Sequence, residues 1–221
     1  MDVIANQFFN LDLMLQSLPL LLKGLSVTLL ICVVVISLGG IVGLLLAIAS
    51  GSPRHWVSWP TIVFVDLFRA VPPLVLLVFV YSGVPFTGIE LSPYAAVVIA
   101  FVLNTSAYYC EVYRAGLLSI APGQFEGARS TGLTQFQTML WVILPQAVRN
   151  VLPDLLSNTV EVVKLTSLAS VVSLGELLYR ADMVRSMSYN SSPIVLAALI
   201  YLLLLWPLVR LISRFERKFN R

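Results

Sequence analysis

Five long stretches of the chain contain few or no charged residues, and they restrict its possible folds more than any other feature. They cover approximately residues 25–49, 62–84, 94–113, 154–178 and 194–212. Each is about 20 residues long, which is the length an α-helix needs to cross a bilayer. With 58% hydrophobic and 11% charged residues among 221, the chain is not expected to be a water-soluble globule. The sequence predicts an all-α integral membrane protein with five transmembrane helices in a single domain, residues 1–221.

The distribution of Lys and Arg predicts how these helices are oriented. Five spans place the two termini on opposite sides of the membrane. If the C terminus is cytosolic, the cytosolic segments hold Arg54, Arg114, Arg129, Arg149, Arg210, Arg214, Arg217, Lys218 and Arg221. Only Lys23, Arg180 and Arg185 then lie outside. Because basic residues concentrate on the cytosolic side, we expect the N terminus outside, the C terminus inside, and residues 116–150 in the cytosol.

This cytosolic segment has the features of two short helices joined by a hinge. Pro122 suits a first helical turn, and Gly132 suits the left-handed residue that ends a helix. Thr134 and Gln137 have the spacing of a capping box at the start of a second helix. Pro145 discourages helix at the residue before it. We therefore expect the second helix to be bounded at both ends.

The same segment carries more large apolar side chains than a loop left in water. They are Phe125, Leu133, Phe136, Met139, Leu140 and Trp141. Exposed apolar patches of this size mark interaction surfaces. We expect another protein to cover them.

The spacing of residues within the segment resembles a known loop. The pattern is Glu126, Gly127 and Ala128, then Gly132 after three residues, then Val142, Leu144 and Pro145 after nine more. It resembles the Glu-Ala-Ala loop of permease subunits of bacterial ATP-binding cassette (ABC) importers, which docks into a groove on the ATPase subunit. Gly127 replaces the family's usual Ala, and Val142 its usual Ile. Gly127 would loosen the first helix by up to about 1 kcal/mol relative to Ala.

Shorter matches narrow the resemblance to the polar amino acid branch of these importers. They cover residues 22–25, 28–29, 68–72, 111–116, 123–124 and 164–168. The resemblance implies the type I importer architecture, with two permeases and two ATPases in the bacterial inner membrane and an extracytoplasmic amino-acid-binding protein. It also implies that ATP and Mg²⁺ bind to the partner ATPase and that this chain binds no cofactor. We expect no nucleic-acid partner.

In this resemblance, residues 116–150 form the coupling loop that transmits movement from the ATPase. The predicted coupling residues are Glu126, Gly127, Ala128, Gly132, Leu133, Phe136, Leu144 and Pro145. Glu126 would fix the loop against basic or amide groups, Gly132 would supply the bend, and the aromatic residues would supply buried contact area.

Three pairs of an acid and a base three residues apart lie in or near the spans. They are Asp66 with Arg69, Glu111 with Arg114, and Glu161 with Lys164. This spacing puts both members on one helix face, where they can neutralise each other. An unpaired charge at the bilayer centre costs about 2.5–3.5 kcal/mol on insertion scales. We expect Glu111 and Arg114 to be a structural pair that anchors the start of the coupling loop.

The deeper charges suggest a path for a substrate. The predicted path residues are Lys164, Glu161, Thr166, Ser167, Arg69 and Pro72. Lys164 would meet a carboxylate, and Glu161 either an amine or Lys164 itself; a purely internal ion pair remains an equal alternative. Pro72 and Pro73 should kink the second span and free carbonyls that could line the path, although a purely structural kink fits the sequence as well.

Several classes of function lack the residues they would need. No Gly-rich phosphate loop followed by Lys and Ser or Thr occurs, so we expect ATP hydrolysis on another subunit. One His and two separated Cys cannot form a zinc site, and no His is placed to activate a nucleophile. We therefore expect neither catalytic nor metal-binding residues. A gradient-driven transporter whose loop only gates, and a non-transporting scaffold, remain alternatives. The transported amino acid, and whether the second permease is a copy or a relative, stay open.

Overall fold

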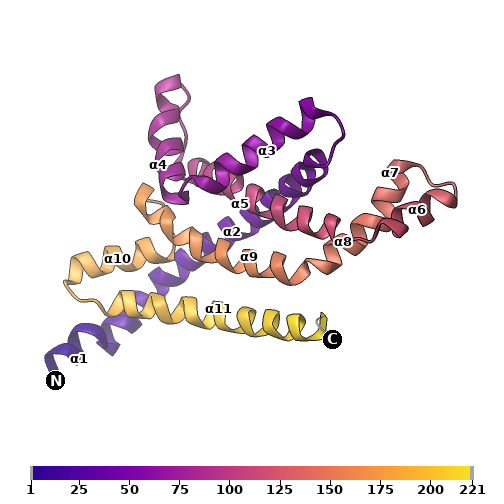
Figure 1. Cartoon of the computed structure of the whole chain (residues 1–221). Coiled ribbons are helices and arrows are strands. Elements are labelled where there is room, and N and C mark those ends of the chain that lie inside the picture. Colours follow the sequence, from indigo (N-terminus) through magenta and orange to yellow (C-terminus); the bar gives the residue numbers. More distant parts are fainter. Residues whose placement is uncertain (1, 220–221) are drawn as a thin grey trace. The chain divides into compact units, whose positions relative to one another are not determined.

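In the computed structural model, which describes residues 2–219, every regular element is helical (Figure 1). This confirms the predicted all-α class. Met1, Asn220 and Arg221 lie outside the described residues, so the cytosolic charge expected of Arg221 is not tested.

Among residues 2–219, four helices are long and apolar enough to cross a membrane, or five if a broken pair counts as one span. The four segments are Asn6–Ser50, Pro93–Leu118, Leu152–Val172 and Ser192–Arg214. The broken pair consists of α3 (His55–Ala70) and α4 (Pro73–Gly83) with its short extension η1 (Val84–Thr87). The five-span topology and its orientation stay predictions.

The first long helix begins earlier than the sequence predicted. After the short α1 (Asp2–Phe8), α2 runs from Leu11 to Ser50, whereas the predicted span began near residue 25. Asn10 explains the early start, because its Oδ1 accepts a hydrogen bond from the backbone N–H of Leu13 at 3.0 Å. Such a cap satisfies one of the free donors at a helix N-terminus.

The second span is interrupted where the sequence predicted a kink. Val71 and Pro72 are both extended, with ψ angles of 126° and 134°, and separate α3 from α4. Pro73 begins the new helix, where its missing N–H is not needed.

The end predicted for the fourth span, residues 154–178, is wrong, because the helix stops before residue 178. The helix α9 (Leu152–Leu165) passes into a 3₁₀ helix, η3 (Thr166–Val172), and stops at Ser173, whose φ is +58°. A new helix, α10 (Leu177–Ser188), then begins with Glu176 as its cap. The remaining predicted spans correspond to α5 (Pro93–Leu118) and α11 (Ser192–Phe219), which both extend further than expected.

Residues 116–150, which were predicted to be cytosolic, fold largely as expected up to their last proline. The elements are α6 (Pro122–Ser130), α7 (Gln135–Gln137), a π-helical turn η2 (Thr138–Ile143) and α8 (Leu144–Asn150). Pro122 starts α6, Gly132 has a φ of +87°, and both hydrogen bonds of the Thr134–Gln137 capping box are present. The predicted interruption at Pro145 is wrong, because Leu144 is helical. Pro145 falls in the first turn of α8, which needs no N–H.

The chain packs as two compact units. Unit 1 comprises the residues up to Ile36 together with Pro72–Phe101 and Val160–Leu211, and unit 2 comprises Ser37–Val71, Val102–Thr159 and the residues from Ile212. The core of unit 1 contains Leu21, Leu177, Ala181 and Ala197. The cores of unit 2 contain Ala47, Val65, Ala107 and Cys110 in one cluster and Ile120, Ile143 and Ala147 in another.

Within unit 2, two glycines let α2 approach α5 closely. A Cβ on Gly43 would lie 2.7 Å from the Cβ of Tyr109 and 2.9 Å from the carbonyl oxygen of Ser106. A Cβ on Gly39 would lie 2.9 Å from Cγ2 of Thr105. Small residues at such crossings allow close backbone packing, so Gly39 and Gly43 permit this contact between the two helices.

We expect Gly43→Ala to destabilise the protein by about 1–2 kcal/mol, because the extra methyl group overpacks a backbone contact. Gly40→Ala is the matched control, since the nearest atom to its added Cβ would be 3.9 Å away and helix propensity favours Ala by up to about 1 kcal/mol. The thermal unfolding midpoint in detergent measures both changes. Equal midpoints for the two variants would contradict the close packing of α2 on α5.

Candidate functional site

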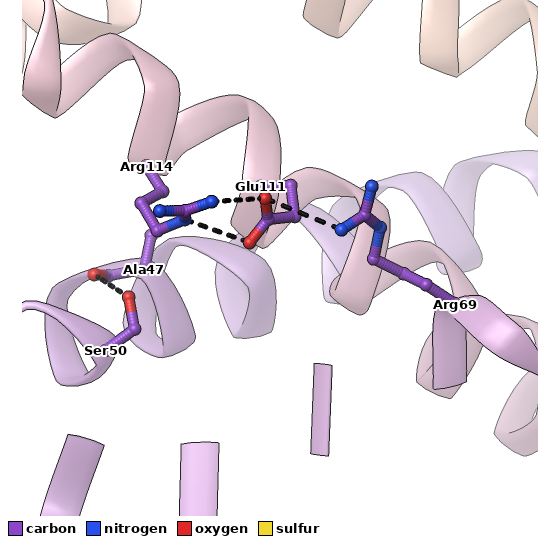
Figure 2. A network of polar contacts seen from close by, with 5 residues as sticks. All are labelled: Ala47, Ser50, Arg69, Glu111 and Arg114. Atoms are coloured by element: carbon purple, nitrogen blue, oxygen red, sulfur yellow. Dashed lines mark hydrogen bonds and ion pairs between the residues drawn. The ribbon is translucent and has the colours of Figure 1, made fainter. Parts of the chain in front are cut away.

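A network of three charged side chains joins α3 to α5 in unit 2. Glu111 accepts two hydrogen bonds from Arg114, at 2.9 Å from Nε and 2.7 Å from Nη2. The same carboxylate lies 3.5 Å from Nη1 of Arg69 on α3. Figure 2 shows Glu111 between the two guanidinium groups. The guanidinium of Arg69 also lies over the ring of Tyr108, 5.7 Å from its centroid. Glu111 therefore holds two arginines that come from different helices.

The predicted pair of Asp66 with Arg69 is wrong. Arg69 pairs with Glu111 on the neighbouring helix instead, and the side chain of Asp66 makes no ion pair or hydrogen bond within residue 4 and residues 6–214, whose side chains the structure describes. Spacing along one helix identifies residues on a shared face, but it does not reveal a competitor on another helix. The second predicted pair, Glu111 with Arg114, is confirmed.

A cavity of about 350 Å³ adjoins this network. Its lining residues are Ser50, Ile62, Val65, Asp66, Arg69, Cys110, Glu111 and Arg114. Two acids and two bases thus face one space. Such a lining can receive a ligand that carries both a cation and an anion.

The end of α3 next to this network is held by Asn104. In an uninterrupted helix the carbonyl of Phe68 would bond to the N–H of residue 72, but Pro72 has none. Nδ2 of Asn104 on α5 donates to this carbonyl at 3.0 Å, and Asn104 is buried. The amide replaces the hydrogen bond that the proline removes, so it fixes the position of Arg69 one residue later.

The third predicted pair forms on α9 in unit 1. Nζ of Lys164 lies 2.6 Å from Oε1 of Glu161, and the two side chains are 53% and 68% exposed. The pair therefore lies on the open face of α9. Whether these residues touch a substrate or only each other stays a prediction.

The two hydroxyl residues that follow differ in their surroundings. Ser167 is partly exposed and donates to the carbonyl of Lys164 at 2.8 Å. Thr166 is fully buried and donates to the carbonyl of Val163 at 2.7 Å. Ser167 thus shares the side of Lys164, while Thr166 is enclosed by the protein.

The predicted coupling loop, residues 116–150, presents aromatic side chains that nothing covers within the described chain. Phe136 is 74% and Trp141 71% exposed. Phe125 and Met139 instead pack against the core that contains Ile143. Figure 1 shows α6 and α7 beside each other. Gly132 lies in the turn that connects them. Phe136 and Trp141 lie on the continuous helical segment formed by α7, η2 and α8, so this segment offers apolar surface to a partner.

The other predicted coupling residues line the same hairpin. Glu126 is exposed, and its side chain makes no hydrogen bond or ion pair with the side chains and backbone that the structure describes. Gly127 is exposed, with no atom within 4 Å of the place that a Cβ would take, whereas Ala128 is buried. Leu133 and Leu144 are half-buried. Glu126 is therefore free to meet a group on another protein.

Residues 39–221 match the family described as binding-protein-dependent transport system inner membrane component. The chain belongs to this family. It is therefore a multi-pass inner membrane component, in keeping with its long apolar helices.

Relatives of this inner membrane component support the same conclusion. It is 38% identical over 194 residues to the probable amino-acid ABC transporter permease protein YckA of Bacillus subtilis (strain 168), covering 87% of this chain and 86% of the relative. It is 32% identical over 213 residues to the arginine transport system permease protein ArtQ of the same organism, covering 95% and 97%. A crystal structure of an amino acid ABC transporter with histidines matches with a TM-score of 0.84 and 32% identity, covering 93% of this chain and 96% of that chain.

Sequence reasoning missed one buried charge in this inner membrane component. Glu176 is completely buried in unit 1 and caps α10, accepting from the backbone N–H of Leu178 at 2.9 Å and of Tyr179 at 2.7 Å. The hydroxyl of Tyr201 on α11 donates to the same carboxylate at 3.1 Å. Burial raises the pKa of the Glu176 carboxyl above its ordinary value, although these hydrogen bonds oppose the increase. The sequence contained one signal for this role, because an acid directly before a run of helix-forming residues is typical of an N-cap.

Proposed function

We propose that the chain is the permease subunit of an ATP-driven importer that translocates a polar amino acid delivered by an extracytoplasmic binding protein. The observation that carries this proposal is the exposed aromatic surface of Phe136 and Trp141 on a hairpin whose hinge, Gly132, has a left-handed backbone. The proposal also draws on relatives that are named as amino-acid and arginine permeases.

In this proposal the coupling loop docks into a groove on the ATPase subunit. Phe136, Trp141 and the half-buried Leu133 supply apolar contact area, while Glu126 meets basic or amide groups of the ATPase. Gly127 and Ala128 form the turn of α6 beside Glu126, and Leu144 and Pro145 form the first turn of α8, which follows η2 directly. Closure of the ATPases around ATP and Mg²⁺ would then move this hairpin as a unit.

The proposed assembly contains two ATPases and a second permease, which is a copy of this chain or a relative. Five helices enclose little space on their own, and Lys164 and Glu161 occupy an open face of α9. We infer that this face borders the translocation path, with Ser167 beside Lys164 and the buried Thr166 supporting the 3₁₀ turn from behind. Arg69 and Pro72 would border the path at the broken span.

The test of coupling is ATP hydrolysis by the purified complex in liposomes, with and without saturated binding protein. We expect Gly132→Asp to abolish the stimulation by the binding protein, because a side chain at a φ of +87° strains the hinge. Glu126→Ala should reduce the stimulation about tenfold if it removes a charge-assisted hydrogen bond to the ATPase. Gly127→Ala is the control and should retain stimulation, since nothing lies within 4 Å of its added Cβ.

A gradient-driven transporter is the second candidate, and the same preparation distinguishes it. Flux that follows a proton or sodium gradient, with no ATPase in the purified complex, would replace the importer proposal. Absence of any amino acid flux would favour a scaffold.

A second experiment separates a substrate contact from an internal ion pair on α9. Lys164→Gln leaves Glu161 unpaired, so it should lower uptake under either interpretation. The double variant with Glu161→Gln removes both charges and should restore uptake if the pair only balances itself. We expect it not to restore uptake, because Lys164 would also bind the carboxylate of the amino acid. Radiolabelled uptake at equal amounts of assembled complex measures the outcome, and full recovery in the double variant would contradict the substrate contact.

A further inference from the structure

The cavity beside the Arg69–Glu111–Arg114 network contains a carboxylate that forms no ion pair with the side chains described in the structure, those of residues 4 and 6–214. Asp66 lines this cavity of about 350 Å³ and is exposed. It lies on α3, four residues before the end of this helix at Ala70. It therefore lies in the last two turns of α3, in the candidate broken span.

An unpaired acid in a membrane-spanning helix is costly, and such residues usually face a cavity or a polar partner. Arg69, which shares its helix face, is engaged by Glu111. Arg114 is close enough to Asp66 to interact with it electrostatically, but its guanidinium also bonds to Glu111. The network thus satisfies Glu111 and leaves the carboxylate of Asp66 available to a cation.

The two arginines retain the capacity to bind an anion. A guanidinium has five N–H donors, and Arg114 directs only its Nε and one Nη2 donor to Glu111. Glu111 therefore orients Arg69 and Arg114 without exhausting their donors. The cavity offers an acceptor for a cation and donors for an anion within one space.

We propose that this cavity is a transit site for the amino acid backbone, in which Asp66 binds the α-ammonium and Arg69 and Arg114 bind the α-carboxylate. This inference rests on the proposed function and adds Asp66 and Arg114 to the path. The volume is at the lower end of ligand pockets, which run from about 300 to 1,000 Å³, and suits a single small zwitterion. Recognition of groups common to all amino acids makes the site independent of the side chain carried.

Protection of a reporter thiol tests the site without relying on transport. The assembled complex is first freed of native thiols by replacing Cys32 and Cys110 with Ala. In this background, Ile62→Cys places a reporter thiol in the cavity lining. His55→Cys places a control thiol at the exposed start of α3, outside the cavity. We expect L-glutamine and L-arginine, without binding protein, to slow alkylation at position 62 but not at position 55. N-acetyl-L-glutamine, which lacks the ammonium, should not protect. Asp66→Asn should raise the concentration for half-protection about tenfold or more, as expected for loss of a charged hydrogen bond.

Two further variants keep the result interpretable. Asp66→Glu preserves the charge and should restore most of the protection. Asp154→Asn removes an exposed acid that does not line the cavity and should leave protection unchanged. Protection that survives Asp66→Asn, or equal protection by N-acetyl-L-glutamine, would overturn the transit site. If neither amino acid protects position 62 while ATP-driven uptake is intact, the transit site is wrong but the importer function stands. If the parent complex shows neither uptake nor stimulated hydrolysis, the proposed function is overturned instead.

Discussion

Replacing Glu176 by Ala should destabilise the permease by about 3 kcal/mol. The substitution would leave the backbone N–H groups of Leu178 and Tyr179 and the hydroxyl of Tyr201 without their acceptor. A buried donor that loses its partner costs about 1–3 kcal/mol, and the deleted side chain also leaves a cavity in the packed unit. The unfolding midpoint of the purified protein in detergent measures the change.

Two controls separate the cap from its link to α11. Tyr201→Phe removes only one of the three donors, so it should cost about 1 kcal/mol. Glu90→Ala removes an exposed acid and should have no measurable effect. An unfolding midpoint for Glu176→Ala that equals the value for Tyr201→Phe would contradict the role of Glu176 as the cap of α10.

Glu176 should also make stability depend on pH. Because burial raises its pKa in the folded protein above the reference value of 4.5, the folded state holds its proton more tightly than the unfolded chain. This contribution to stability is complete below pH 4.5 and decreases as pH rises through the folded-state pKa. Glu176→Gln should therefore flatten the decrease of the unfolding midpoint with rising pH.

The second large effect is expected for Glu111→Ala, which removes the acid shared by Arg69 and Arg114. An uncompensated Arg costs up to about 3.5 kcal/mol at the bilayer centre. The penalty is smaller here because Arg114 is expected at the cytosolic end of α5 and both arginine side chains are partly exposed, so solvent screens their charges. We expect a loss of about 2 kcal/mol and a clear decrease in the amount of assembled complex in the membrane.

Glu111→Gln preserves an acceptor but not the charge, so its effect should be intermediate. The matched control is Asp182→Asn, which breaks the exposed pair of Asp182 with Arg185 outside the candidate spans. Exposed pairs of this kind contribute at most about 1 kcal/mol. Quantitative immunoblotting of membranes, together with the unfolding midpoint, measures both quantities. Normal amounts of Glu111→Ala would show that the two arginines do not depend on Glu111.

Local signals in the sequence predicted the local structure well. Pro122, Gly132 and the pair of Thr134 with Gln137 act within a few residues, and each occupies the predicted position. The length of the apolar stretches predicted the all-α class for a similar reason, because a membrane-spanning helix is specified by consecutive residues. Errors arose at Pro145, because the position of a proline within a helix depends on where that helix starts.

Contacts between distant parts of the chain were not predictable in this way. The carboxylate that reaches Arg69 comes from Glu111, on a different helix, and the partner of the Phe68 carbonyl comes from Asn104. The carboxylate of Glu176 is likewise paired with Tyr201 on another helix. A single sequence shows that these residue types are present, but their partners are chosen by helix packing.

The 3₁₀ helix η3 also acts as a spacer of defined length. Its seven residues occupy about 14 Å at a rise of about 2.0 Å per residue, whereas an α-helix of equal length would occupy about 10.5 Å. The difference is about two α-helical residues. The helix η3 lies between Lys164 and Leu177, whose N–H donates a hydrogen bond of 3.2 Å to Oγ1 of Thr28. If η3 wound into an α-helix, the segment would shorten, and either Lys164 or that buried hydrogen bond would have to shift.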